Sequence, residues 1–343
     1  MLYVGTDLSR KRLDWHALDR GGVTLATGAV TPHRDGLARL VCEVARIDEA
    51  DDGVVGVIES MNGARFVHDQ LELAGWEMRI ADPRKARGIA PLAAKTDKID
   101  AWVLAELARL DLVPEIWLPT PGVREERERA RFRLHLVRHR TMLKHRVHAT
   151  LLAHGAPCPV ADLFGNKGRQ LLDRLALPEP WRGTLDASIR MLEHLDEEIS
   201  QLESDLRKLG ADHPYVPTLM TAPGIAWILG YTIAAEIGDI TRFATPAKLV
   251  GYTGLAPRVS QSGSRDHRGS LTKAGPPYLR WALVEAAQHA AQHTAYNTLY
   301  EHTKQRLGRQ RGAKVAKIVV ARKLAEAIWW MLHRGAPFAP KGV

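Results

Sequence analysis

The chain has 343 residues, of which 25% are charged and 45% hydrophobic, a composition typical of a soluble protein with two or three cores. This composition excludes a disordered chain and collagen. A membrane span is excluded because apolar runs such as residues 327–332 are far shorter than the ~20 residues that cross a bilayer. The two cysteines are too few for a disulfide framework or a zinc site. No signal peptide is expected, because Asp7, Arg10 and Lys11 interrupt the only apolar N-terminal stretch. We therefore expect a cytoplasmic protein without a membrane partner.

Charge is divided unevenly along the chain. Lys and Arg number 48 against 39 Asp and Glu, a net charge of +9. Residues 1–120 hold 15 basic and 19 acidic residues, a net charge of −4, so residues 121–343 hold 33 and 20, a net charge of +13. This division predicts a polyanion-binding part joined to a part that uses carboxylates. Nucleic acid is the expected partner, and a basic surface kept for solubility is the alternative.

Residues 1–115 have the pattern of a complete α/β domain. Three short apolar stretches come first, and a glycine turn at residues 19–22 indicates that the second and third form a hairpin. Helical and strand patterns then alternate. The expected strands are residues 2–5, 13–18, 23–30, 54–58 and 78–81, and the expected helices begin at Thr31 and cover residues 64–73 and 99–110. This order, βββαβαβα, is that of the ribonuclease-H-like fold.

A long basic helix is expected next, because residues 124–146 carry nine Lys and Arg but only three acids. Its apolar side is expected to consist of Phe132, Leu136, Leu143, Val147 and Leu151. The helical pattern breaks at residues 154–159, and a short helical insert that ends at residues 177–180 is expected to follow. Leucine and isoleucine then recur every three or four residues from Leu185 to Leu209, with acids on the outer face. The two helices predict an antiparallel coiled coil. Two helices packed within one bundle are the alternative.

A mostly helical third region is expected after Gly210. Residues 221–226 lie between two apolar helical stretches and are similar to the hairpin of a helix-hairpin-helix module. In such a hairpin, free backbone N–H groups near Gly224 would contact a phosphate, and a plain turn is the alternative. The expected domains are therefore residues 1–115, 116–210 and 211–343.

Basic residues are also concentrated near the C-terminus. Gly308 and Gly312 predict an open loop that follows a phosphate backbone, and basic residues 314–323 predict the solvated face of a helix. Trp329 and Trp330 are expected in the core or in a subunit contact, with base stacking as the alternative.

Four acids are candidates for a metal site. Asp7 follows the first strand and Glu59 the buried central strand, while Asp97 and Asp100 lie three residues apart at a helix start, on one face. Carboxylates brought this close repel unless a divalent metal neutralises them. Two Mg²⁺ ions on oxygen ligands are suited to in-line displacement at phosphorus. Each acid alone also has a structural explanation, such as an N-cap for Asp97, and Asp14 is left out because it faces the second strand without a partner.

Several segments, taken together and in this order, resemble the DEDD transposases of insertion sequences, the Piv/MooV-type recombinases. They are residues 4–11 (VGTDLSRK), 57–60 (VIES), 81–84 (ADPR), 95–101 (KTDKIDA), 254–257 (GLAP), 262–263 (SG), 271–275 (LTKAG) and 279–280 (LR). The resemblance spans nearly the whole chain.

The resemblance implies a RuvC-like domain with Asp7, Glu59, Asp97 and Asp100 as metal ligands, a coiled-coil middle, and a C-terminal transposase domain with Ser262 as nucleophile. Ser260, Ser264 and Ser270 lie in the same expected loop as Ser262. The implied enzyme uses Mg²⁺, with two ions expected and Mn²⁺ as a substitute, and forms a covalent serine–DNA intermediate. The resemblance also implies a structured guide RNA that pairs with donor and target double-stranded DNA.

Four strand cleavages are needed to recombine two duplexes, so a homodimer that assembles into a tetramer is expected, associated with the nucleoid when bound to DNA. The candidate nucleic-acid contacts are Arg131, Arg138, Lys144, Gly224, Arg258, Arg265, Lys273 and Arg309.

Three other functions are compatible with parts of the sequence. A RuvC-like nuclease or Holliday-junction resolvase would need the four acids but no serine. An actin-like sugar kinase or ATPase shares the opening strand and hairpin, but a second glycine-rich phosphate loop is not found. A non-catalytic DNA- or RNA-binding protein would require that the acids do not converge.

Overall fold

The computed structural model describes residues 1–48, 52–89, 97–262 and 265–340, without the side chains of residues 97–98, 262 and 265–268. The chain forms two compact units, Met1–Leu118 and Pro119–Val343. No helix within the described residues is long and apolar enough to cross a membrane.

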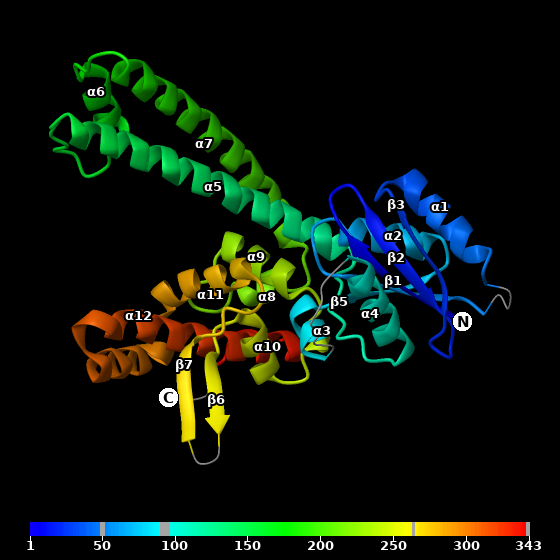
Figure 1. Cartoon of the computed structure of the whole chain (residues 1–343). Helices are drawn as coiled ribbons and strands as arrows, with labels where there is room; N and C mark the ends of the chain where they lie inside the picture. Colours follow the sequence, from blue (N-terminus) through cyan, green and yellow to red (C-terminus); the bar gives the residue numbers. More distant parts are fainter. Residues whose placement is uncertain (49–51, 90–96, 263–264, 341–343) are drawn as a thin grey trace. The chain divides into compact units, whose positions relative to one another are not determined.

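A five-stranded sheet is the centre of the first unit (Figure 1). Its strands are β1 (Leu2–Leu8), β2 (Leu13–Leu18), β3 (Thr24–Val30), β4 (Val54–Glu59) and β5 (Glu77–Ala81). The strand order is β3-β2-β1-β4-β5. The first three strands are antiparallel, and β4 and β5 continue the sheet in parallel with β1. The predicted mixed α/β domain is confirmed, and its strand order supports the ribonuclease-H-like interpretation.

Helices cover both faces of this sheet. Helices α1 (Arg34–Ala45) and α2 (Ala64–Leu73) cover one face, where they bury Leu40 and Leu71 in the larger of this unit's two apolar cores. Helix α4 (Asp97–Arg109) covers the other face, where Leu104 packs against Val55 and Val57. All three helices lie where the sequence predicts them. The short helix α3 (Pro83–Ile89) was not predicted.

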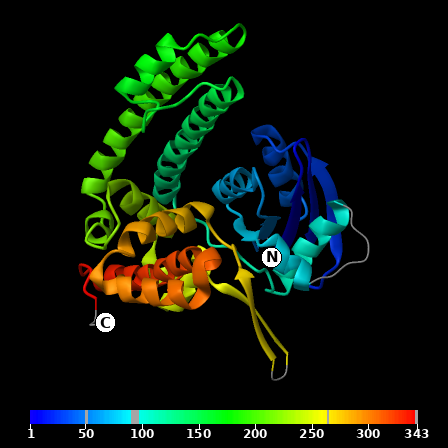
Figure 2. The same cartoon turned by 90° about the vertical axis from the view of Figure 1, so that its left-hand side faces the viewer.

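Two long antiparallel helices, α5 (Pro121–Ala153) and α7 (Trp181–Ala211), begin the second unit (Figures 1 and 2). Arg133 pairs with Glu203, and Arg140 pairs with Asp196 at 2.9 Å. The side chains buried along α7 include four spaced seven residues apart, Leu185, Leu192, Ile199 and Leu206. The helix pair is as predicted, whereas coiled-coil geometry stays a prediction. Phe132 and Leu209 were expected in the apolar seam but are 45% exposed, because the seam passes through Leu134 and Leu206.

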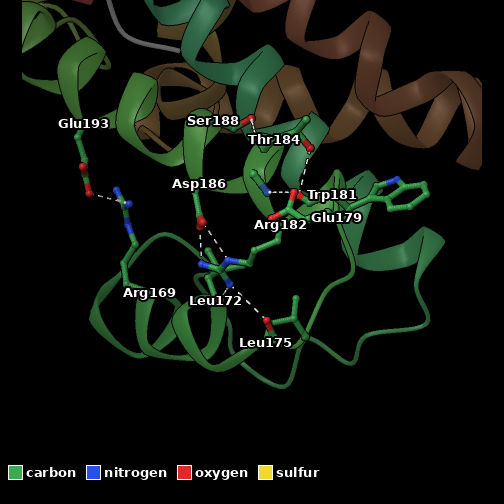
Figure 3. Close-up of polar contacts among 11 residues, drawn as sticks. Arg169, Leu172, Leu175, Glu179, Trp181, Arg182, Thr184, Asp186, Ser188 and Glu193 are labelled. Atoms are coloured by element: carbon green, nitrogen blue, oxygen red, sulfur yellow. Dashed lines mark hydrogen bonds and ion pairs between the residues drawn. The ribbon is translucent and has the colours of Figure 1, made fainter.

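A small helix, α6 (Asn166–Arg174), lies between the C-terminal end of α5 and the N-terminal end of α7 (Figure 1). Arg182 pairs with Asp186 and donates hydrogen bonds to the carbonyl oxygens of Leu172 and Leu175 at 2.9 and 3.3 Å (Figure 3). These bonds satisfy carbonyl groups at the C-terminus of α6, where a cation is favourable. The end of the helix pair therefore combines these polar contacts with an apolar core formed by Val147, Leu151, Leu163, Leu172 and Leu185.

The rest of the second unit is mostly helical, as predicted. It consists of α8 (Val216–Leu219), α9 (Trp227–Ile237), a 3₁₀ turn η1 (Ile240–Arg242), α10 (Pro246–Thr253), β6 (Pro257–Ser262), β7 (Arg265–Leu271), α11 (Pro277–Ala290) and α12 (Thr294–Arg334).

Two sequence predictions for this part were wrong. The expected polar loop around Ser262 contains the paired strands β6 and β7. The expected open loop at Gly308 is a kink within α12 instead, because only Gly308 leaves helical geometry. Trp329 lies in the core, as predicted, and donates a hydrogen bond to the carbonyl oxygen of Phe243 at 2.7 Å, whereas Trp330 is 46% exposed.

Candidate active site

Asp7 and Glu59 occupy neighbouring positions at one end of the sheet. Strands β1 and β4 are parallel, and their last aligned pair is Thr6 with Ile58. One further residue in each strand gives Asp7 and Glu59, so the two acids are adjacent and point to the same face. That face is the one covered by α4, because Tyr3, four residues before Asp7, and Val57, two residues before Glu59, pack there. Both acids are half-buried.

Helix α4 lies directly on β1. A Cβ atom on Gly5 would be 1.9 Å from the carbonyl oxygen of Ala101 and 2.4 Å from the backbone nitrogen of Ala105. Only glycine permits this approach of helix to strand. Because Gly5 is two residues before Asp7, the first turns of α4 lie near the end of β1.

The opposite end of α4 fixes its direction. Arg109 donates a hydrogen bond to the carbonyl oxygen of Arg20, at 3.5 Å, in the turn between β2 and β3. This turn is at the end of the sheet where β1 begins, since Leu18 pairs with Tyr3. Helix α4 therefore runs antiparallel to β1, and its N-terminal turn, with Asp100, lies toward the end that holds Asp7.

The backbone thus directs Asp7, Glu59 and Asp100 to one end of the first unit. Asp97 is the first residue of α4, but its side chain lies outside the described residues. In the described part of the chain, no three His, Cys, Asp or Glu side chains form a group that could hold a metal ion. The donor set nevertheless fits the predicted metal by its chemistry, because carboxylate oxygens are the ligands of Mg²⁺ and Mn²⁺. The four-acid site stays a prediction.

A fifth acid lies beside this group. Asp14 is directly opposite Asp7 in the β1–β2 register and is 3% exposed. It was expected to have no partner, but Arg12 donates two hydrogen bonds to its carboxylate, at 2.7 and 2.8 Å. Arg12 directly precedes β2 and is two residues from Asp14, a spacing that puts two side chains on one face of an extended chain and that was visible in the sequence. Arg12 neutralises Asp14 and so reduces its value as a metal ligand.

Ser262 is the last residue of β6, and its side chain lies outside the described residues, as does all of Ser264. Ser260 and Ser270 are exposed on β6 and β7. The base of the hairpin is held closely, because a Cβ on Gly275 would lie 1.9 Å from the carbonyl oxygen of Tyr252 in α10. The choice of nucleophile among the serines stays a prediction.

The predicted nucleic-acid contacts differ in their surroundings. Arg131 donates hydrogen bonds at 2.7 and 2.9 Å to both carboxylate oxygens of Glu236, which is fully buried in α9. This bond raises the pKa of Arg131. Arg127 adds bonds to the carbonyl oxygens of Ala235 and Glu236, each at 2.8 Å. Arg131 therefore joins α5 to α9, and a phosphate would have to compete with Glu236 for it.

Two other predicted contacts stack on aromatic rings. The Arg138 guanidinium lies 5.4 Å from the ring centre of Tyr278, and the Lys144 amine lies 4.8 Å from that of Phe164. Arg258, Lys273 and Arg309 are exposed, and the side chain of Arg265 lies outside the described residues.

Gly224 has a packing role of its own in the predicted hairpin. Its φ is +79°, and a Cβ there would lie 2.2 Å from the carbonyl oxygen of Ala286 in α11. Close contact with α11 therefore explains this glycine without a phosphate.

Two family models match the chain. One, for DEDD transposases of the IS110 type and described as a transposase, matches residues 4–155. The other, described as the transposase IS116/IS110/IS902 family, matches residues 216–301. The first covers the sheet with Asp7, Glu59 and Asp100, and the second covers the hairpin with Ser262.

Similar proteins are found along nearly the whole chain. The transposase for insertion sequence element IS1328 of Yersinia enterocolitica is 26% identical over 98% of both chains. The transposase for insertion sequence element IS1111A of Coxiella burnetii is 23% identical over 96% of this chain and 89% of its own. Two models of one transposase family thus match, in order, more than half of the sequence, and relatives align with nearly all of it. The chain belongs to the IS110/IS116/IS902 family of DEDD transposases.

Proposed function

We propose that this chain is an RNA-guided recombinase that cuts and rejoins donor and target DNA at the ends of its insertion sequence. Membership of a transposase family supports DNA transposition. The proposed chemistry is supported by one feature of the backbone: the ends of β1 and β4 and the N-terminal turn of α4 lie toward the same end of the sheet. The guide RNA is proposed from the resemblance, and the charge of +13 on residues 121–343 offers surface for nucleic acids.

Asp7, Glu59, Asp97 and Asp100 are the residues that would hold the metal, Mg²⁺ or Mn²⁺ in its place. Two such ions supply activation of the attacking oxygen and stabilisation of charge on the leaving oxygen. The protein places hard oxygen donors at the end of a rigid sheet and under a helix, where their repulsion favours binding of a cation.

Ser262 is the proposed nucleophile. Its oxygen forms a bond to the phosphorus of one DNA strand, the bond from phosphorus to a deoxyribose oxygen breaks, and that oxygen leaves with a proton. The covalent intermediate keeps the energy of the phosphodiester, so a hydroxyl of another strand can reverse the reaction without a nucleotide cofactor. Ser260, Ser264 and Ser270 are the alternatives.

The proposed working assembly is a tetramer formed from two homodimers, because joining two duplexes needs four cleavages. Within each chain, residues 1–115 act as the RuvC-like part, residues 116–210 as a coiled coil, and residues 211–343 as the transposase part.

One cleavage assay tests the chemistry. The chain is expressed with its native flanking DNA, any RNA that copurifies is sequenced, and labelled donor duplex is incubated with protein and Mg²⁺ before a denaturing gel. We expect Asp7→Asn, Glu59→Gln and Asp100→Asn each to lower cleavage at least about 100-fold, equivalent to ~3 kcal/mol of lost electrostatic stabilisation. Ser262→Ala is expected to abolish the covalent protein–DNA adduct. EDTA is expected to have the same effect as the acid variants.

Asp35→Asn is the matched control, because this exposed acid lies in the first turn of α1, on the opposite face of the sheet. It is expected to leave cleavage unchanged. An adduct that persists in Ser262→Ala excludes this serine, and cleavage without an adduct favours a RuvC-like nuclease. Full activity of Asp7→Asn contradicts the metal site, and absence of a discrete copurifying RNA contradicts guidance.

A further inference from the structure

A kink at Gly308 divides α12 into two helical arms. Gly308 has φ 74° and ψ −180°, a conformation that interrupts the helix, after which the chain turns back. A Cβ on Gly312 would lie 2.3 Å from the carbonyl oxygen of Lys304, so the two arms of α12 touch there. Figure 1 shows the arms side by side. Residues 304–314 are called the α12 tip below.

The α12 tip is strongly basic. It contains five cations and no acid, and all five are exposed: Lys304, Arg306, Arg309, Arg311 and Lys314. Lys304 is paired with Glu301 at 3.1 Å. None of the other four is paired with a carboxylate of a described residue. Cations concentrated in one short segment repel one another, so the tip favours an anion that contacts several of them at once.

The side chains of the α12 tip favour phosphate in particular. Its three arginines offer paired N–H donors that match two oxygens of one phosphate. Leu307, 40% exposed, is the one large apolar side chain in the tip, too little apolar surface to bind a protein partner.

We propose that the α12 tip binds the phosphate backbone of a nucleic acid duplex. The tip lies beyond residue 301, where the second family match ends. This inference rests on the proposed function, in which duplex DNA and a structured RNA are both bound.

The salt dependence of binding tests this proposal. The triple variant Arg306→Ala/Arg309→Ala/Arg311→Ala is titrated with a random-sequence DNA duplex and with an RNA stem of equal length, in EDTA, over a range of salt concentrations. Each phosphate contact contributes about 0.9 to the slope of log K against log salt for duplex DNA. We expect the variant to bind more weakly regardless of sequence, with a slope about 2 to 3 units shallower on at least one duplex.

A matched variant on α6 and α7 provides the control. Arg174→Ala/Arg190→Ala/Arg207→Ala removes the same charge from exposed positions of α6 and α7 and is expected to keep the wild-type slope. A change on DNA alone assigns the tip to donor or target, and a change on RNA alone assigns it to the guide. Equal slopes for both variants and the wild type, or equal losses in both variants, overturn the proposal.

Because EDTA prevents metal-dependent cleavage, this measurement does not depend on the proposed acids or serine. If the cleavage proposal fails, the expected difference in slope between the triple variant and the wild type is not affected. If the tip proposal fails, the expected cleavage by the four acids is not affected. Loss of binding to anionic vesicles but not to either duplex would overturn the proposal by assigning the tip to a lipid surface.

Discussion

At the scale of single residues, Glu236 is the buried acid on which the junction of α5 and α9 depends. Its carboxylate is fully buried and pairs with Arg131, while Arg127 lies 4.0 Å away. Glu236→Gln removes the negative charge from a fully buried position and leaves Arg131, 36% exposed, and Arg127, 11% exposed, without their carboxylate partner. We expect the free energy of unfolding of the second unit to fall by about 3 to 5 kcal/mol, measured by urea denaturation.

The control for this prediction is Glu125→Gln. Glu125 is 65% exposed and forms an ordinary i, i+4 pair with Arg129 on α5. Its loss is expected to cost no more than about 0.5 kcal/mol. Equal costs for the two variants would mean that the buried pair contributes no more than a surface pair.

Residues of the candidate site differ in how far sequence could predict them. Asp7 and Glu59 end apolar strands, and parallel pairing alone makes them neighbours. Arg131 could not be distinguished from the other cations of its helix, because its partner Glu236 lies 105 residues further along the chain. A charge whose partner is distant in sequence resembles a free charge until the fold is known.

At the scale of elements, the contact of α4 with β1 is predicted to control both stability and activity. Gly5→Ala would put a methyl group 1.9 Å from the carbonyl oxygen of Ala101, and backbone at this position cannot rotate away as a side chain can. We expect a loss of about 3 kcal/mol or more, at the upper end for overpacking. DNA cleavage is expected to fall as well in protein that remains folded, because α4 carries Asp100. Thermal unfolding and the cleavage assay together measure both effects.

Gly88→Ala is the matched change in α3, where an added Cβ would meet nothing within 4 Å. It is expected to be neutral or to stabilise by about 0.5 to 1 kcal/mol. Wild-type stability and cleavage in Gly5→Ala would show that α4 can shift from β1 without consequence.

The element order of the first unit was predictable because each strand and helix there carries its own apolar period. The hairpin of β6 and β7 was not, because its residues are mostly polar and carry no alternating apolar pattern. The kink in α12 was misread as a loop because Gly308 and Gly312 look alike in sequence. One interrupts the helix, whereas the other lets its two arms touch.

At the scale of the whole molecule, the division of charge coincides with the division of structure. Residues 119 and 120 are uncharged, so the unit Met1–Leu118 has the net charge of −4 and the unit Pro119–Val343 that of +13. Each of the apolar cores also draws its residues from one unit alone. The two units thus differ in both charge and core, as expected of parts that fold separately.

Separate cores predict two unfolding transitions in calorimetry. Leu40 and Leu283, 0% and 1% exposed, lie in the cores of the first and second unit. Replacing either by alanine is expected to cost about 2 to 5 kcal/mol, enough to move one transition by several degrees. Leu40→Ala should move only the transition of the first unit and Leu283→Ala only the other, so each variant is the control for the other. A single transition that both variants move equally would mean that the chain unfolds as one cooperative body, with the acids of the first unit and the hairpin of the second stabilised together.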